Sequence, residues 1–299
     1  MNRRQFLNAL AMATPAIFTL GAIPASASFL DDLTDIVPDE VTTIFESGKK
    51  IAAGFEDITP EQEYYLGRSV AAVILSRYTP LNHPHSLAYV NVMGQTLAQA
   101  SDRPETFGGY HFMVLDADEI NALSAPGGFV FVTKGLLKCC TSEDAIAAVL
   151  AHEIGHVQRQ HGLQAIQESR ITDGVTTLAI TGTSTLSGGT LKELTTTFDD
   201  SIKAITTTMI DSGYSRAAED EADEDAVTIM QRLGYDPNAI IDMLNQMRKR
   251  MSPGSEGFAR THPTPTQRIE EITEIIGIYK RPQTCTPRAA RFSRMTKGL

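Results

Sequence analysis

The chain has 299 residues, a formal net charge of −10 and ordinary fractions of apolar (42%) and charged (21%) residues. This length is enough for one or two globular domains with a sizeable core. The acidic balance argues against nucleic acid and anionic membrane surfaces as partners, because their phosphate groups repel a negatively charged protein. The cysteines at 139, 140 and 285 cannot all pair within one chain. The sequence therefore leaves open one disulfide to Cys285 or three buried thiols.

Residues 1–27 have the pattern of an export signal. The pair Arg3-Arg4 is a twin-arginine start, and Ala25-Ser26-Ala27 is typical of a cleavage site. The apolar run between them is short and contains a proline, which argues against a membrane-spanning helix. We therefore expect export to a bacterial periplasm by the twin-arginine route, with no spanning segment after signal removal. An uncleaved N-terminal anchor is the alternative.

The rest of the chain is predicted to be mainly helical. Residues 28–60 are acidic and weakly amphipathic, which predicts a helical arm or linker. Apolar periodicity and strand-forming composition predict, in order, helix 61–78, helix 86–100, strand 110–115, strand 129–133, helix 214–233, helix 237–251 and helix 268–279. The segment 121–128, between the two strands, is rich in turn residues. Strand 129–133 just precedes the helix described next, so we expect it to hold an extended peptide by added-strand pairing, unless it is only a core strand.

The helix after that strand contains the pattern H-E-x-x-H. His152 and His156 are four residues apart in an apolar run, so on a helix they share one face and can hold one Zn²⁺. Glu153 is offset around the helix and can reach a metal-bound water without being a ligand. The hydroxyls and acids at 141–144 are typical of a helix start. A structural or accidental histidine pair is the alternative.

Three other histidines are expected to lie away from the metal. His83 and His85 flank a proline in a loop, where solvated side chains are favoured over a metal site. His161 would finish the H-E-x-x-H helix and point away from its metal-binding face, so we expect it to be solvated. The segment 171–213 is rich in threonine, glycine and serine, which predicts a flap or helical hairpin over the cleft.

A third zinc ligand is expected from the acidic helix 214–233. A carboxylate from this second helix would complete a two-histidine, one-carboxylate zinc site and leave the fourth position for water. Spacing alone does not choose among Glu219, Glu221 and Asp223, and the acids could instead form a solvated face. Small residues beside them permit close approach to another helix.

The C-terminal region contains one more candidate and a basic tail. His262 precedes a proline and is held in an extended backbone, so it could approach zinc as a ligand or proton donor, or form a hydrogen bond within its loop. Residues 280–299 carry basic side chains and no acid, which predicts a tail that is disordered or pairs with the protein's own surface.

Taken together, these motifs resemble the zinc metallopeptidases of the CaaX prenyl protease and HtpX type, and most closely their soluble periplasmic members. The similarity includes the H-E-x-x-H pattern, the segment from Ser215 to Asp223 and the His262-Pro263 pair. It implies a mainly α fold with a small β-sheet (α+β), of the zincin-like metallopeptidase type, over residues 61–279. It also implies that Glu219 is the third ligand of a single Zn²⁺ and that Asp223 orients a ligand histidine.

The expected function is that of a periplasmic zinc endopeptidase acting on unfolded or misassembled envelope proteins, including misfolded outer-membrane proteins. Glu153 would accept a proton from water and return it to the leaving amine. His262 or Arg268 would stabilise the oxyanion or gate the metal. The alternative is a zinc-stabilised chaperone or assembly factor for outer-membrane proteins, and a zinc hydrolase acting on peptidoglycan peptides is a weaker third reading.

Overall fold

The computed structural model describes residues 58–172, 203, 206–207, 210–211, 213–250, 262, 264–281 and 286–299. The predicted export signal, nearly all of the 28–60 arm and most of the predicted flap at 171–213 lie outside these described residues. Among the described helices, none combines the length and the apolar character that crossing a membrane requires.

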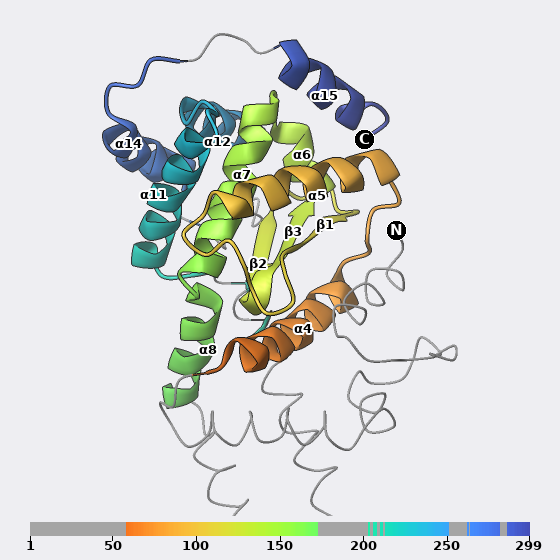
Figure 1. Cartoon of the computed structure of the whole chain (residues 1–299), viewed down its shortest axis with the longest axis vertical. Helices are drawn as coiled ribbons and strands as arrows, with labels where there is room; N and C mark the ends of the chain where they lie inside the picture. Colours follow the sequence, from red (N-terminus) through yellow and green to blue (C-terminus); the bar gives the residue numbers. More distant parts are fainter. Residues whose placement is uncertain are drawn as a thin grey trace, which may run out of the picture.

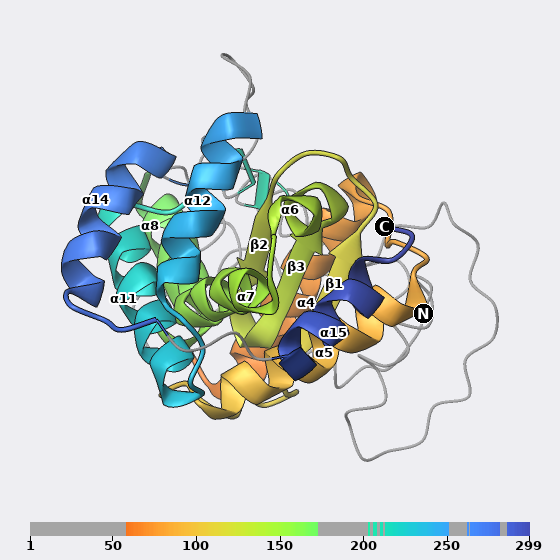
Figure 2. The ribbon, with the colours of Figure 1, turned by 90° about the horizontal axis from the view of Figure 1, so that it is seen from above.

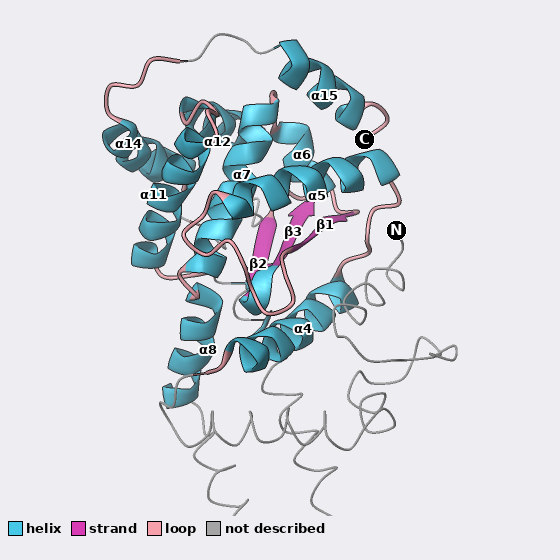
Figure 3. Ribbon diagram, in the orientation of Figure 1, coloured by secondary structure: helices cyan, strands magenta, loops and turns pink. Residues whose placement is uncertain are grey.

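Helices dominate the described part of the chain and surround a small sheet (Figure 3). The helices are α4 (Pro60–Arg77), α5 (Pro84–Gln99), α6 (Lys134–Cys139), α7 (Glu143–Gln158), α8 (His161–Thr172), α11 (Arg216–Arg232), α12 (Asn238–Arg250), α14 (Pro265–Ile276) and α15 (Thr286–Thr296). The strands are β1 (His111–Leu115), β2 (Ala122–Ala125) and β3 (Phe129–Thr133), with the 3-10 turn η1 (Pro126–Gly128) between the last two. This confirms the predicted α+β class with a zincin-like arrangement.

The sheet has the strand order β1-β3-β2, with β3 parallel to β1 and antiparallel to β2. Two predictions were wrong here. The segment 121–128 contains a strand, which sequence reading missed because Ala-Leu-Ser-Ala lacks β-branched and aromatic residues. Strand 129–133 is the central strand, so both of its backbone edges are already paired and it cannot receive a peptide. The edge strand that packs on α7 is β2.

Apolar side chains alternate between two cores on the two faces of the sheet. Phe112 and Val114 of β1 pack in the core that includes α5 and α7, whereas Met113 and Leu115 pack in the core that includes α4. Because both faces are covered, β1 and β3 are apolar at nearly every position. The sheet therefore gives α7 a rigid apolar surface to pack on.

Helix α7 stands between the sheet and a group of helices formed by α11, α12 and α14 (Figures 1 and 2). It begins as predicted, because the Ser142 hydroxyl caps the helix by accepting a hydrogen bond from the Ala145 backbone N–H. At its crossing with α11, a Cβ on Gly155 would lie 3.0 Å from the carbonyl oxygen of Ala222. Glycine and alanine at this crossing let the two helices approach closely, as the small residues on α11 predicted.

The basic C-terminal segment is helical and docked, so the second of its two predicted alternatives is the one observed. Arg291 of α15 donates to both carboxylate oxygens of Glu143, at 2.5 and 2.9 Å, and Arg288 donates to Asp144 at 3.0 Å. Both acids lie in the first turn of α7, where carboxylates also interact favourably with the helix dipole. Helix α15 therefore holds the start of α7 in place through these ion pairs.

The thiols of Cys139 and Cys140 are free and buried at the end of α6. Burial raises the pKa of both thiols, which makes them poor nucleophiles. Cys285 lies outside the described residues.

Candidate metal centre

Four buried side chains from three parts of the chain converge beside α7. His152 and His156 come from α7, Glu219 from α11, and His262 from the loop that precedes α14. Each offers a potential ligand atom, and all of these atoms lie within 4.8 Å of one another. The close crossing of α7 and α11 is what brings Glu219 opposite the two imidazoles.

The separations between the facing atoms fit a shared metal ion. The Nε2 atoms of His152 and His156 are 3.1 Å apart, and each lies 3.5 Å from a different carboxylate oxygen of Glu219. Tetrahedral zinc ligands at about 2.0–2.1 Å from the ion lie about 3.3 Å from one another. In addition, the buried Oε1 atom of Glu219 accepts no hydrogen bond, which is unusual for a carboxylate and is explained by a cation. The donor set therefore fits Zn²⁺.

His262 contacts this group through Glu219. Its Nδ1 atom lies 2.7 Å from Glu219 Oε2, and because a carboxylate only accepts, the imidazole donates this hydrogen bond. Burial raises the pKa of Glu219, but the charge of His262 and the hydrogen bonds of His152 and His262 outweigh burial and hold that pKa well below its usual range. The carboxylate is therefore ionised, as a metal ligand must be.

The outer nitrogen of His152 faces a buried ion pair. Its Nδ1 atom lies 2.9 Å from Asp223 Oδ1, and Arg268 donates to both oxygens of Asp223, at 2.5 and 3.0 Å. Burial opposes ionisation of Asp223, but Arg268 and His152 outweigh it and lower the pKa of Asp223. Asp223 thus lies directly beside His152, and Arg268, 2% exposed, lies behind His152 rather than in the pocket.

The outer nitrogen of His156 faces His161, and the prediction that His161 is solvated was wrong. His161 is 2% exposed, and its Nδ1 atom lies 2.9 Å from Nδ1 of His156. Helix α7 ends at Gln158 instead of continuing to His161, and Gln160 has a φ of +60°. This left-handed residue redirects the chain, so that His161 begins α8 and turns back toward His156.

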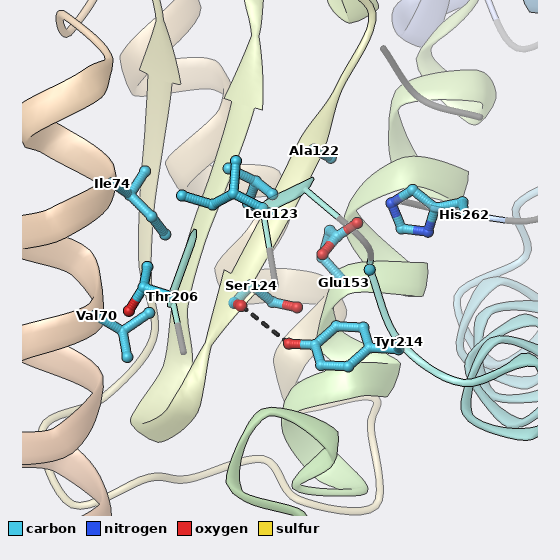
Figure 4. Close-up of a pocket in the computed structure, with 11 residues that line it drawn as sticks. Val70, Ile74, Ala122, Leu123, Ser124, Glu153, Thr206, Tyr214 and His262 are labelled. Carbon is cyan, nitrogen blue, oxygen red and sulfur yellow. Dashed lines mark hydrogen bonds between the residues drawn. The ribbon is translucent and has the colours of Figure 1, made fainter. Parts of the chain in front are cut away.

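A pocket adjoins the four-residue cluster. Figure 4 shows the Glu153 carboxylate on the same side of this pocket as His262 and Tyr214, opposite Val70 and Ile74. Burial raises the pKa of Glu153, although the nearby His152 and His262 partly offset this effect. The geometry therefore places an acid of raised proton affinity beside the cluster and in contact with the pocket that adjoins it.

Tyr214 is a site residue that sequence reading missed. Its hydroxyl donates to the backbone carbonyl of Ser124 on β2 at 3.2 Å, and its ring centroid lies 4.3 Å from that of His156. Burial and the negative charge of Glu153 raise the pKa of Tyr214, so its hydroxyl stays protonated. No motif marked it, because a single tyrosine before a helix has no characteristic spacing.

Sequence comparison identifies known proteins that are similar to this chain. Residues 84–276 match the model of peptidase family M48. The chain is 26% identical over 271 residues to the beta-barrel assembly-enhancing protease of Escherichia coli K12, covering 90% of this chain and 52% of that protein. It is 29% identical over 227 residues to the putative protease of the same name from Vibrio cholerae, covering 73% and 44%. It is also 29% identical over 228 residues to the mitochondrial metalloendopeptidase OMA1 of Schizosaccharomyces pombe, covering 74% and 63%.

The fold, the donor set and these matches together are those of the zinc metalloproteases. The family match covers well over half of the chain, and the chain belongs to peptidase family M48. The chain spans about half the length of the bacterial relatives that it matches.

Proposed function

We propose that the protein is an endopeptidase that hydrolyses peptide bonds in unfolded or misassembled envelope proteins, including misfolded outer-membrane proteins, in a bacterial periplasm. The observation that carries the hydrolytic part is the position of Glu153, a buried carboxylate that lines the pocket directly beside the converging His152, His156 and Glu219. A site that only held a structural ion would have no use for a second, non-ligating carboxylate facing a pocket.

His152, His156 and Glu219 would hold the metal in this proposal. When bound there, zinc supplies a Lewis acid that polarises a carbonyl group and lowers the pKa of water. His262 keeps the Glu219 carboxylate oriented through its 2.7 Å hydrogen bond, and its place on the pocket wall also lets it face a substrate carbonyl oxygen. Arg268 acts on His152 indirectly, because its hydrogen bonds to Asp223 fix the carboxylate that faces His152.

Glu153 is the proposed proton carrier of the reaction. Its carboxylate accepts a proton from the attacking water as the carbon–oxygen bond forms at the scissile carbonyl. It then returns that proton to the amide nitrogen, so that the carbon–nitrogen bond breaks and a neutral amine leaves. The raised pKa of Glu153 suits the first step, because a more basic carboxylate takes the proton more readily.

Strand β2 is the proposed docking edge for the substrate backbone. It is the edge strand nearest α7, and its Ser124 lines the pocket next to Glu153. An extended peptide added there would be recognised through its backbone, which suits unfolded substrates of varied sequence. The wall opposite Glu153 includes Val70 and Ile74 of α4, so an apolar substrate side chain is favoured in the pocket.

The deciding test compares the wild type with Glu153→Gln, assayed for zinc content and for cleavage of casein, an unfolded protein. Glutamine keeps the shape but cannot accept the proton, so we expect full zinc content and a loss of cleavage of roughly 10²–10⁴-fold. Unchanged cleavage would remove Glu153 from its role. A wild-type protein that holds zinc and binds unfolded protein without cutting it would favour a chaperone or assembly factor instead.

A further inference from the structure

We propose that His161 and Glu221 are positioning residues for His156, and that they fix the tautomer and direction with which this imidazole faces the metal. This rests on the proposed ligand role of His156. The observation is a chain of three side chains: Nδ1 of His156 lies 2.9 Å from Nδ1 of His161, and Nε2 of His161 lies 3.0 Å from Oε2 of Glu221.

The proton positions along this chain follow from the metal-facing end. If Nε2 of His156 binds the metal, the neutral ring must carry its proton on Nδ1, which then donates to His161. Nδ1 of His161 is therefore the acceptor, and its proton must sit on Nε2. That proton is donated to the Glu221 carboxylate, which can only accept. Each of the three groups has one consistent role, and reversing the tautomer of either ring would leave two donors or two acceptors facing each other.

The backbone is built to place His161 at this point. Gln160 is the only residue other than glycine with positive φ in the described part of the chain, and this conformation is strained for a residue with a Cβ. Its side chain donates to the buried Glu63 carboxylate at 3.1 Å, which helps to hold the turn. Had α7 simply continued, His161 would point away from the metal-binding face. The strained turn brings it back beside His156.

The burial of His161 argues against a role in contacting substrate. Its side chain is 1% exposed and does not line the pocket, so it does not touch substrate there. The Glu221 side chain is 49% exposed, so the chain of contacts runs from the buried cluster to the surface. His161 thus links a surface carboxylate to a buried imidazole through two side-chain contacts. Orienting partners of this kind typically change metal affinity or activity by 10–100-fold.

The test uses three substitutions at His161 that separate its two nitrogens. In His161→Asn, the amide oxygen falls near the position of Nδ1 and can still accept from His156. In His161→Gln, the amide falls near the position of Nε2, which keeps the contact with Glu221 but loses the contact with His156. His161→Leu loses both. At the far end, Glu221→Ala removes the carboxylate, and Glu224→Ala is the matched control, because it removes an exposed acid from the same helix.

The readouts are the rate of zinc loss to a chelator, the absorption spectrum of the Co²⁺-substituted protein, and the melting temperature of the metal-free protein. None needs substrate, so they remain valid if the protein proves not to be a protease. We expect zinc loss to be roughly 10–100-fold faster in His161→Leu and His161→Gln, and near the wild-type rate in His161→Asn. The Co²⁺ spectrum should shift in the first two variants only.

The proposal further expects Glu221→Ala to lose zinc faster than Glu224→Ala, at similar metal-free melting temperatures. It is overturned if His161→Leu holds zinc as firmly as the wild type, or if Asn and Gln at position 161 behave alike. It is also overturned if the rates of zinc loss merely follow the metal-free melting temperatures, since that pattern would indicate a purely structural role.

Discussion

The two imidazoles that α7 contributes to the cluster are supported in contrasting ways. His152 faces a carboxylate directly, and that carboxylate, Asp223, is buried and neutralised by the buried Arg268. His156 faces a second imidazole, and the carboxylate behind it, Glu221, is half exposed. Burying a carboxylate is expensive unless a cation pairs with it. The His156 side avoids a second buried ion pair by keeping its charge at the surface and placing a neutral ring in between.

The difference predicts that the two supports contribute unequally to stability. Removing the carboxylate in Asp223→Ala leaves the Arg268 guanidinium buried without its main counter-charge. We expect the free energy of unfolding to fall by about 3–5 kcal/mol, as is typical when one partner of a buried ion pair is removed. Denaturant unfolding of the metal-free protein measures this directly. A loss below about 1 kcal/mol would show that Asp223 is less important to the interior than its burial indicates.

The same contrast predicts how the metal-free protein responds to pH. Burial and Arg268 lower the pKa of His152, but the charge and hydrogen bond of Asp223 outweigh them and raise it to about 9, above the ordinary value of 6.5. A group whose pKa is raised in the folded state stabilises that state fully when the pH is below its pKa in the unfolded chain. This stabilisation is lost as the pH rises through its pKa in the folded protein.

We therefore expect the melting temperature of the metal-free protein to fall between pH 6.5 and about 9. His156 does not contribute to this fall, because burial lowers its pKa and it changes charge at a lower pH. The matched variant Asp223→Asn, which lacks the charge, should show a flatter profile. A wild-type melting temperature that stays level or rises across this interval would contradict the assignment to His152.

The smallest effect is expected at the surface end of the His156 support. Glu221→Ala should lower the free energy of unfolding by less than about 1 kcal/mol, because exposed charged groups contribute little. Its effect on zinc retention should be larger than its effect on stability, which is the reverse of the order expected for a residue that serves only to hold the fold together. Denaturant titration beside the chelator assay separates the two.

Sequence reading predicted the parts of this site that local chemistry determines. Three of these parts follow from the local sequence of single helices. They are the start of α7, the face that His152 and His156 share, and the small residues at the α11 crossing. Choosing Glu219 over Glu221 and Asp223 needed the family resemblance, because which acid meets the imidazoles depends on how two helices cross. Sequence periodicity does not encode that crossing.

The wrong predictions share a physical cause, which is that non-local packing decided the outcome. Strand 129–133 looked like an edge because it precedes α7, but its place in the sheet was set by a strand that carries small residues. His161 was expected to be solvated because the helix was assumed to run on. The break comes at Gln160, and nothing marks it in the sequence, because glutamine is an uncommon residue for a left-handed turn.

The ion pairs between α15 and the first turn of α7 have a consequence for when the site can form during synthesis. Glu143 is buried, and its closest cationic partner, Arg291, lies 148 residues further along the chain. The ribosome therefore makes the H-E-x-x-H helix long before the arginine that fastens it, and Glu219, His262 and Arg268 also emerge after it. A nascent chain cannot assemble a complete centre until most of the domain has been translated. In the proposed protease, this order of emergence delays a complete site until synthesis of the domain is nearly finished.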